Sequence, residues 1–299
     1  MFTQLRRSHF IALSMTLAFG VPAHASATRT FVATTGNDAN TAANCGAATP
    51  CRTFGAALGV TNSGGELVVL NSGGYGPTTI SQSVTITAIG VDASISVTKA
   101  GGTGIEINTT GNVTLNGLKL YGEAVGQFGI EVDQVGYLRL YNILIENFTN
   151  IGLDMETGGN LEVYGSEMND NLMSAVFLAG TSVGYIAGSS FNHNGEGVGA
   201  AEGGKATVVD SSALYNVGGG FITFAGQMTL VNSRSAFNGS GMQSGGGGTF
   251  YFVNCIITNN SLAYLIVSGG TMAGTNPGSN FIEPGQGTTG TLSTPVALQ

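Results

Sequence analysis

Apolar and polar residues alternate along much of the chain, and from Asn112 onward this pattern recurs at a fixed spacing. Seven consecutive segments of 22 to 25 residues align on one another: 112–136, 137–159, 160–182, 183–204, 205–226, 227–248 and 249–270. Each opens with a run such as Tyr137-Leu-Arg-Leu-Tyr141, in which the second and fourth residues are apolar. A period of two is typical of a strand that is buried on one face. The fourth residues of the openings are therefore predicted to form one buried column: Leu115, Leu140, Val163, Ile186, Val208, Leu230 and Phe252.

Two further sets of similar residues recur at fixed positions. A corner of small residues follows the opening strand at Gly165-Ser166, Gly188-Ser189, Asp210-Ser211, Asn232-Ser233 and Asn254-Cys255. The twelfth position of five successive segments is occupied by Asn171, Asn194, Asn216, Asn238 and Asn260. An Asn at a bend adopts left-handed backbone angles readily and can hydrogen-bond to its counterparts above and below, so these residues predict a stacked, repeated turn.

The repeat predicts the fold class. A period of 20 to 25 residues with three short strand-like runs indicates a β-solenoid. Leucine-rich repeats need a fixed Leu framework with a helical return, and propeller blades need about 40 residues, so neither fits. We expect a parallel β-helix of about nine coils over residues 65–270, with Arg139 pairing with Glu162 and Tyr141 stacking on Tyr164 on its outer surface.

The ends of the chain depart from the repeat. Residues 1–27 combine Arg6 and Arg7, an apolar stretch, and small-residue cleavage patterns ending at Ala25 and Ala27, which is typical of a secretory signal peptide. We therefore expect a periplasmic or extracellular protein, cleaved after one of these two residues, with no membrane insertion. Residues 28–64 are predicted to cap the first coil through a short helix with Thr53 as its N-cap, and residues 271–299 to run as a tail across the last coil.

Composition limits both the fold class and the choice of partners. Glycine accounts for 49 of 299 residues and charged residues for only 9%, which excludes an ordinary helical domain, and 42% hydrophobic residues argue against disorder. Without residues 1–27 the chain keeps seven basic and 17 acidic residues, a net charge of −10. It lacks the Lys and Arg residues that phosphate contacts need, so we expect no nucleic-acid partner. Acidic polysaccharides are repelled too unless a divalent cation bridges the two surfaces.

The three cysteines predict one disulfide. Export favours oxidation, and the five-residue loop between Cys45 and Cys51 predicts a local bridge beside the capping helix. Cys255 stands where other segments carry Ser, which indicates a small buried side chain. A nucleophilic cysteine needs a His partner, and residues 28–299 contain only His193, so no catalytic residue is predicted.

Carboxylates cluster on the third strands of three successive coils, which read GIEIN from Gly104, GIEVD from Gly129 and GLDME from Gly152. Stacking in register would place Glu106, Glu131 and Asp154 in one column, with Asn108, Asp133 and Glu156 beside it. The five carboxylates would then share one outer face at a strand spacing of about 4.8 Å. Like charges directly opposite destabilise a sheet, so we expect solvent, a raised pKa or a bound cation to relieve the repulsion.

Two interpretations of this face stay open. A solvated acidic surface that keeps the rod soluble is favoured, because clustered carboxylates mark function only statistically. Alternatively, Glu131, Asp133, Asp154 and Glu156 are candidate calcium ligands. The next coil presents Phe177, predicted to be an exposed ring on which a sugar could stack. The candidate substrate-binding residues are Glu106, Glu131, Asp133, Asp154, Glu156 and Phe177, with calcium as the candidate cofactor and a polysaccharide or cell-surface glycan as the candidate partner.

The N-terminal part of the chain resembles a known family. The run from Phe31 to Asn40, the segment from Pro50 to Leu58, and Gly73-Gly-Tyr-Gly76 before a strand at 83–87 are similar to the opening of bacterial right-handed β-helix proteins of the pectate-lyase-like superfamily. The resemblance covers nearly all of the chain after the signal peptide. It implies an all-β, single-stranded right-handed parallel β-helix with a short N-terminal capping helix. It implies little about function, because this fold carries lyases, hydrolases, esterases and adhesins.

The enzymes of that family supply the catalytic alternative. Their pectate lyases bind an acidic sugar through calcium held by carboxylates, and a nearby Arg abstracts a proton. Here the repeat places Arg139 on an opening strand and Arg234 after a corner, both away from the acidic strands. The acid and Arg constellations of the family's galacturonases and pectin methylesterases are missing too. We therefore expect a non-catalytic exported protein that binds a glycan or cell-surface component or has a structural envelope role, with a calcium-dependent polysaccharide lyase or a related carbohydrate-active enzyme as the alternative.

Overall fold

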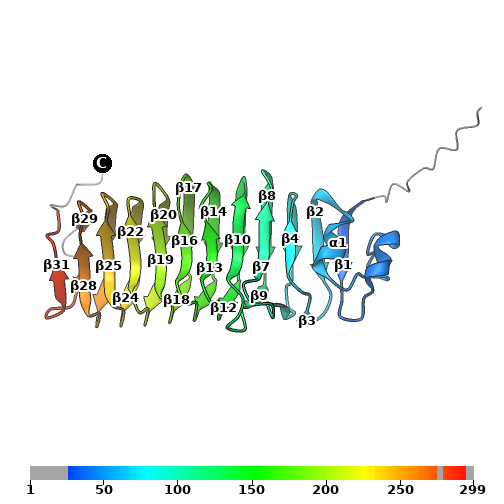
Figure 1. The fold of residues 1–299 in the computed structure, drawn as a ribbon, viewed down its shortest axis with the longest axis horizontal. Coiled ribbons are helices and arrows are strands. Elements are labelled where there is room, and N and C mark those ends of the chain that lie inside the picture. The colour runs from blue at the N-terminus through cyan, green and yellow to red at the C-terminus, as the bar shows by residue number, and fades with distance from the viewer. Residues whose placement is uncertain (1–25, 275–278, 294–299) are drawn as a thin grey trace, which may run out of the picture.

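The computed structural model describes residues 26–274 and 279–293, so the predicted signal peptide lies outside the described residues except for Ser26 and Ala27. The described chain forms an elongated stack of coils, with its N-terminal part at one end and its C-terminal part at the other (Figure 1). Each full coil contributes one short strand to each of three parallel sheets. This is the predicted right-handed parallel β-helix, and it has about ten turns.

The strands of each sheet follow one another along the stack. The first sheet contains β1 (Ala27–Val32), β2 (Thr61–Val69), β5 (Val84–Thr87), β8 (Asn112–Asn116), β11 (Tyr137–Tyr141), β14 (Gly159–Tyr164), β17 (Ser182–Ala187), β20 (Lys205–Val209), β23 (Gln227–Val231), β26 (Thr249–Val253) and β29 (Thr271–Gly274). The second sheet contains β3 (Gly73–Gly74), β6 (Ala93–Ser96), β9 (Leu118–Tyr121), β12 (Leu144–Glu146), β15 (Glu167–Asn169), β18 (Ser190–Asn192), β21 (Ser212–Leu214), β24 (Arg234–Ala236), β27 (Ile256–Thr258) and β30 (Phe281–Ile282). The third sheet contains β4 (Thr78–Ile80), β7 (Thr103–Asn108), β10 (Phe128–Gln134), β13 (Ile151–Met155), β16 (Ser174–Leu178), β19 (Glu196–Ala201), β22 (Gly219–Phe224), β25 (Ser240–Gly245), β28 (Leu262–Ile266) and β31 (Gly287–Thr289).

The core is the interior of the stack. Strands of the first sheet pair residue by residue, so Leu140 lies between Leu115 of the preceding coil and Val163 of the next. The predicted column is confirmed, because all seven of its side chains are at most 2% exposed. Burying one aliphatic side chain of this size contributes about 1.5–3 kcal/mol. On the outer surface, the predicted Tyr141–Tyr164 stack and the Arg139–Glu162 ion pair are also present.

A ladder of serines closes the first corner, where the first sheet turns into the second. The backbone N–H of Ser166 donates to Ser189 Oγ at 3.2 Å, and the same hydroxyl donates to the carbonyl of Ala187 at 3.0 Å. The bond from N–H to hydroxyl repeats from Ser189 to Ser211 and from Ser211 to Ser233. The residue before each of these serines has a positive φ, which explains the Gly, Asp and Asn residues there.

A ladder of asparagines closes the second corner, where the second sheet turns into the third. Asn171, Asn194, Asn216, Asn238 and Asn260 are buried, and the side-chain Nδ2 of each of the first four donates to the Oδ1 of the next Asn at 2.9–3.2 Å. The stacked turn is confirmed, but the prediction that the Asn residues themselves adopt left-handed backbone angles was wrong. The left-handed residue is the one before each Asn, with φ between +54° and +59°: Asp170, His193, Tyr215, Phe237 and Asn259.

The N-terminal end is capped as expected. The helix α1 (Phe54–Leu58) begins after Thr53, whose hydroxyl accepts the N–H of Ala56 at 3.3 Å, and a 3₁₀ helix η1 (Asp38–Ala43) precedes it. Cys45 and Cys51 form a disulfide with a Cα–Cα distance of 5.0 Å. Cys255 is free and buried, as predicted. Within the described ranges, no helix has the length and apolar character needed to cross a membrane.

Strand pairing continues beyond the predicted end of the repeat at Gly270. β29, β30 and β31 add a strand to each sheet, and Met272 is buried like the inward residues of earlier coils. These strands and β1 extend the stack past the nine coils that the repeat predicted. Farther along, Leu292 packs against the core and the N–H of Ser293 donates to the carbonyl of Met272 at 2.8 Å.

Introducing a charge into the buried column is expected to open the stack locally. Val163→Asp should lower the free energy of unfolding by about 3–5 kcal/mol, because an unpaired carboxylate would replace a fully buried side chain. Val183→Asp is the matched control, since Val183 lies on the next strand of the same sheet but is 44% exposed. Urea unfolding followed by circular dichroism compares the two, and equal losses for both variants would contradict the assigned inward register.

Candidate functional site

Three carboxylates from successive coils lie in one column on the outer surface of the third sheet. β10 pairs with β7 and with β13, so Glu131 lies opposite Glu106 on one side and Asp154 on the other. We call these three residues the acidic column, and its register is as the sequence predicted. Because parallel strands are about 4.8 Å apart, neighbouring carboxylates in the column repel one another.

Threonine hydroxyls hold two of the carboxylates. Thr103 Oγ1 donates to Glu131 Oε2 at 2.8 Å, and Thr79 Oγ1 donates to Glu106 Oε2 at 3.2 Å. A hollow of about 560 Å³ adjoins this end of the column and is lined by Gly55, Pro77, Thr78, Thr79, Thr103 and Glu106. The N-terminal half of the column therefore combines hydrogen-bond donors and acceptors beside an open space.

Asp154 differs from the other two carboxylates because it is buried. Only 8% of the residue is exposed, and its Oδ1 has no hydrogen-bond partner among the described residues. Burial, followed by repulsion from Glu156 and Glu131, raises the pKa of Asp154 to about 7. A raised pKa was one of the three expected ways to relieve the repulsion between carboxylates, and it applies to Asp154 at this end of the column.

Phe177 continues the column on the next coil, opposite Asp154. Its ring is half-buried, so the prediction of an exposed ring was wrong. The physical reason is Gly199 on the following strand, where a Cβ atom would lie only 3.1 Å from Phe177 Cδ2. The ring leans over the space that this glycine leaves, which occupies part of the surface that a sugar would need.

The predicted alignment of Asn108 with Asp133 beside the acidic column does not form. β10 has an irregularity just before Gln134, so Asn108 pairs with Gln134 and not with Asp133. The prediction that Asn108 lines up with Asp133 was therefore wrong, because one extra residue shifts the end of the strand. The alignment of Asp133 with Glu156 stays a prediction. Asp133 and Glu156 are both exposed.

The candidate calcium ligands do not converge. Within residues 26–274 and 279–293, no three Asp, Glu, His or Cys side chains lie close enough together to hold a metal ion. Calcium typically takes six to eight oxygen ligands, so the residues present do not offer a preformed site. The calcium assignment stays a prediction.

Arginine side chains lie away from the acidic column. Arg139 is on β11 of the first sheet, where it pairs with Glu162 at 3.3 Å, and Arg234 is on β24 of the second sheet. Arg29 on β1 pairs with Glu66, and Arg52 donates to the carbonyl of Gly74. None of the third-sheet strands that the structure describes contains Arg or Lys. The acidic column thus lacks the basic partner that proton abstraction by Arg would need.

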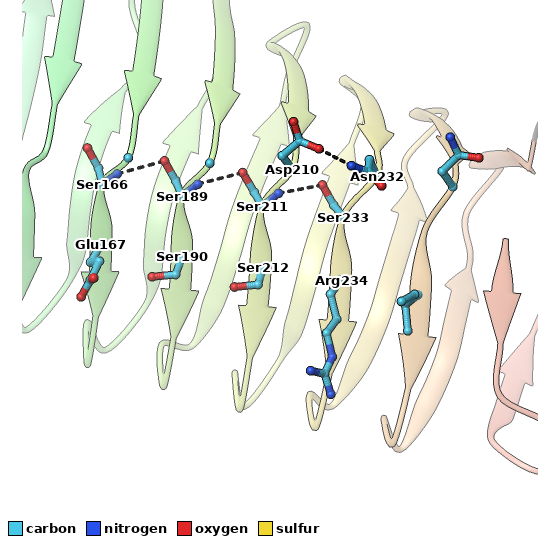
Figure 2. A pocket seen from close by; sticks show the side chains of 14 residues that line it. Ser166, Glu167, Ser189, Ser190, Asp210, Ser211, Ser212, Asn232, Ser233 and Arg234 are labelled. Carbon is cyan, nitrogen blue, oxygen red and sulfur yellow. Dashed lines mark hydrogen bonds between the residues drawn. The ribbon is translucent and has the colours of Figure 1, made fainter. Parts of the chain in front are cut away.

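A groove of about 380 Å³ along the first corner was not predicted from the sequence (Figure 2). Glu167, Ser190, Ser212 and Arg234 follow one another along it on successive coils. Figure 2 also shows the serine ladder, whose hydroxyls are already hydrogen-bonded to backbone groups of the stack. The small residues were visible in the sequence, but a groove arises only when several such corners are superposed.

The raised pKa of Asp154 predicts a specific dependence of stability on pH. Between the usual carboxyl value of 3.8 and about 7, the folded state holds a proton that the unfolded chain has released. The contribution of Asp154 to stability is therefore fully present below pH 3.8 and is lost as pH rises to about 7. Asp154→Asn should remove this loss, so urea unfolding at pH 4 to 8 should show the variant gaining stability relative to the natural protein as pH rises. Asp133→Asn is the exposed control, and parallel pH profiles for the natural protein and Asp154→Asn would contradict the assignment.

The comparisons with known proteins bear on the fold. The family described as "Right handed beta helix region" matches residues 129–282. No curated protein sequence matches the chain. Among solved structures, the chain is similar to "pectate lyase Pel9A", with 15% identity and a TM-score of 0.45 over 92% of this chain and 78% of that one, a likeness too low to say anything about chemistry. The family match covers more than half of the chain, which therefore belongs to the right-handed β-helix family.

Proposed function

We propose that this protein is exported and binds a glycan or another cell-surface component through the third sheet without catalysing a reaction on it. The proposed surface consists of the acidic column together with Thr79, Thr103 and Phe177, and we call it the acidic face. The observation that carries the proposal is the register of Glu106, Glu131 and Asp154, which holds three mutually repelling carboxylates on one sheet. A bound partner with hydrogen-bond donors would relieve that repulsion.

The chemistry of the acidic face favours an uncharged ligand rich in hydroxyl groups. Carboxylate oxygens accept hydrogen bonds, and bonds to an ionised acceptor are stronger than bonds between neutral groups. Glu106 and Glu131 recur at the strand spacing of about 4.8 Å, which suits an extended polymer lying along the stack. Acidic polysaccharides fit poorly, because both the acidic face and the net charge would repel them.

The placement of charged groups supports binding without reaction. A lyase of the expected kind needs a base such as Arg beside the bond that it cleaves. Arg139 and Arg234 project from the other two sheets. The strands that carry the acidic column contain no Arg or Lys, so the acidic face lacks such a base.

The second candidate is a carbohydrate-active enzyme, and one observation favours it. A buried carboxyl such as Asp154, with a pKa raised to about 7, could take up or release a proton near neutral pH, and such groups cluster at active sites. Glu131 would be its neighbouring carboxylate. A calcium-dependent polysaccharide lyase would in addition need a metal cluster, which the described part of the chain does not present.

Export is part of the proposal and rests on the disulfide together with the predicted signal peptide. Disulfides such as Cys45–Cys51 persist in oxidising compartments. We therefore place the protein in the periplasm or outside the cell. A structural role in the envelope would use the same elongated stack (Figure 1) without a ligand on the acidic face.

Binding to a glycan array, with affinities then measured by calorimetry, tests the proposal. Glu131→Gln should weaken binding of an uncharged oligosaccharide about tenfold, because it removes one charge-assisted hydrogen bond. Glu167→Gln is the matched control, since Glu167 is exposed on the second sheet, and it should leave this affinity unchanged. Equal affinities for both variants would contradict binding at the acidic face. Release of products from any polysaccharide, lost in Asp154→Asn, would instead establish the enzymatic alternative.

A further inference from the structure

The second corner carries three aromatic side chains at a left-handed backbone position that disfavours two of them, Tyr215 and Phe237. In six successive coils, the residue that precedes the turn into the third sheet has a positive φ: Asn147, Asp170, His193, Tyr215, Phe237 and Asn259. Asn, Asp and His tolerate the left-handed region, whereas bulky residues such as Tyr and Phe rarely adopt it. The neighbouring Asn ladder fixes the backbone of this turn and holds Tyr215 and Phe237 in the unusual conformation. Strain of this kind concentrates at functional sites.

The three aromatic rings form one continuous stack. The ring centroids of His193 and Tyr215 lie 5.2 Å apart with planes 5° from parallel, and those of Tyr215 and Phe237 lie 4.8 Å apart with planes 7° from parallel. All three residues are exposed, Tyr215 and Phe237 by 49% and 42%. Each ring covers the face of its neighbour, so only the two ends of the stack present a free aromatic face. At the His193 end, the next residue of the column is Asp170, which has no ring.

A hollow opens at the His193 end of the stack. It has a volume of about 310 Å³ and is lined by residues of several coils, including Asn147, Asp170, Leu172, His193 and Val217. Tyr215 and Phe237 do not line it. Leu172 and Val217 are 71% and 84% exposed, an unusual exposure for aliphatic side chains. The hollow therefore combines an aromatic face, aliphatic edges, a carboxylate and an amide.

The negative charge beside the hollow limits the kind of ligand that it can bind. Its wall carries the Asp170 carboxylate, and Asp170 and Glu167 act after burial to raise the pKa of the nearby Glu146 carboxyl. Asp170 therefore lines the hollow with the Glu146 and Glu167 carboxylates near it, and an acidic ligand would be repelled. An uncharged ligand with hydroxyl groups would donate hydrogen bonds to the Asp170 carboxylate. It could both donate to and accept from the side-chain amide of Asn147.

We propose that this hollow binds one uncharged hexopyranose unit, whose C–H face packs on the free face of His193 as the next layer of the aromatic stack. In this site Asp170 and Asn147 bind the hydroxyl groups, and Leu172 and Val217 pack against the edge of the sugar. Tyr215 positions the His193 ring by stacking behind it, whereas Phe237 contacts Tyr215 and not the His193 ring. The site lies at the second corner, is separate from the acidic face, and does not depend on the function proposed for that face.

The residues found at the same left-handed turn position in other coils suggest the variants for the test. Asn occupies the same left-handed position at Asn147 and Asn259, so the fold should tolerate His193→Asn, which removes the aromatic face. Phe237→Asn is the matched control at the far end of the stack, and it should retain sugar binding and raise the melting temperature by relieving the unfavourable backbone conformation. The probes are the tetrasaccharides of glucose, mannose, galactose and N-acetylglucosamine, with tetragalacturonate as the acidic control. Saturation-transfer NMR detects binding, and calorimetry measures affinity.

The expected result is that at least one uncharged tetrasaccharide binds, that His193→Asn weakens this binding about tenfold, and that Phe237→Asn changes it less than about twofold. Tetragalacturonate should not bind. Absence of binding by all four uncharged probes, or equal affinities for His193→Asn and the natural protein, would overturn the proposal. Glu131→Gln separates the two surfaces: loss of binding in that variant with retention in His193→Asn would place the sugar on the acidic face and contradict the site at the second corner.

Discussion

In-register stacking of coils of nearly equal length is the constraint on which the rest of the structure depends. Each coil pairs its backbone with the coils before and after it, so any residue position becomes a column of equivalent positions. Apolar positions then form a continuous core, exemplified by Leu140 between Leu115 and Val163. Polar positions become ladders, in which Ser166 and Asn171 each hydrogen-bond to their counterparts on the next coil. A single register therefore determines the core, both corner ladders and the surface columns.

The same constraint gathers like charges. A carboxylate repeated at one position cannot move away from its neighbours without breaking the register, so Glu106, Glu131 and Asp154 remain adjacent. The column relieves this repulsion in different ways along its length. Thr79 and Thr103 donate hydrogen bonds at one end, and the buried Asp154 has a raised pKa at the other. A chain this poor in charged residues maintains such a column at a cost in stability, which is why we interpret it as a binding surface.

The sequence was sufficient to predict what depends on the repeat alone. The inward column, the corner of small residues, the stacked Asn turn, the Tyr141–Tyr164 stack and the alignment of the acidic column follow from the spacing of 22 to 25 residues. Features that depend on neighbouring side chains could not be predicted in this way. The irregularity before Gln134 removes Asp133 from its expected alignment with Asn108, and Gly199 lets the ring of Phe177 lean over the next strand. The aromatic stack at the second corner was missed because its members, His193, Tyr215 and Phe237, share a backbone conformation and not a residue type.

The most direct test of the stacked register at the acidic column is an NMR titration of the Asp154 side-chain carboxyl, measured in the natural protein and in Glu131→Gln. Burial and the adjacent carboxylates should give a pKa of about 7 in the natural protein. Removing the charge of Glu131 should lower that pKa, because Glu131 lies opposite Asp154. A pKa near the usual carboxyl value of 3.8, or a raised pKa that does not respond to Glu131→Gln, would contradict the burial of Asp154 or its contact with the column.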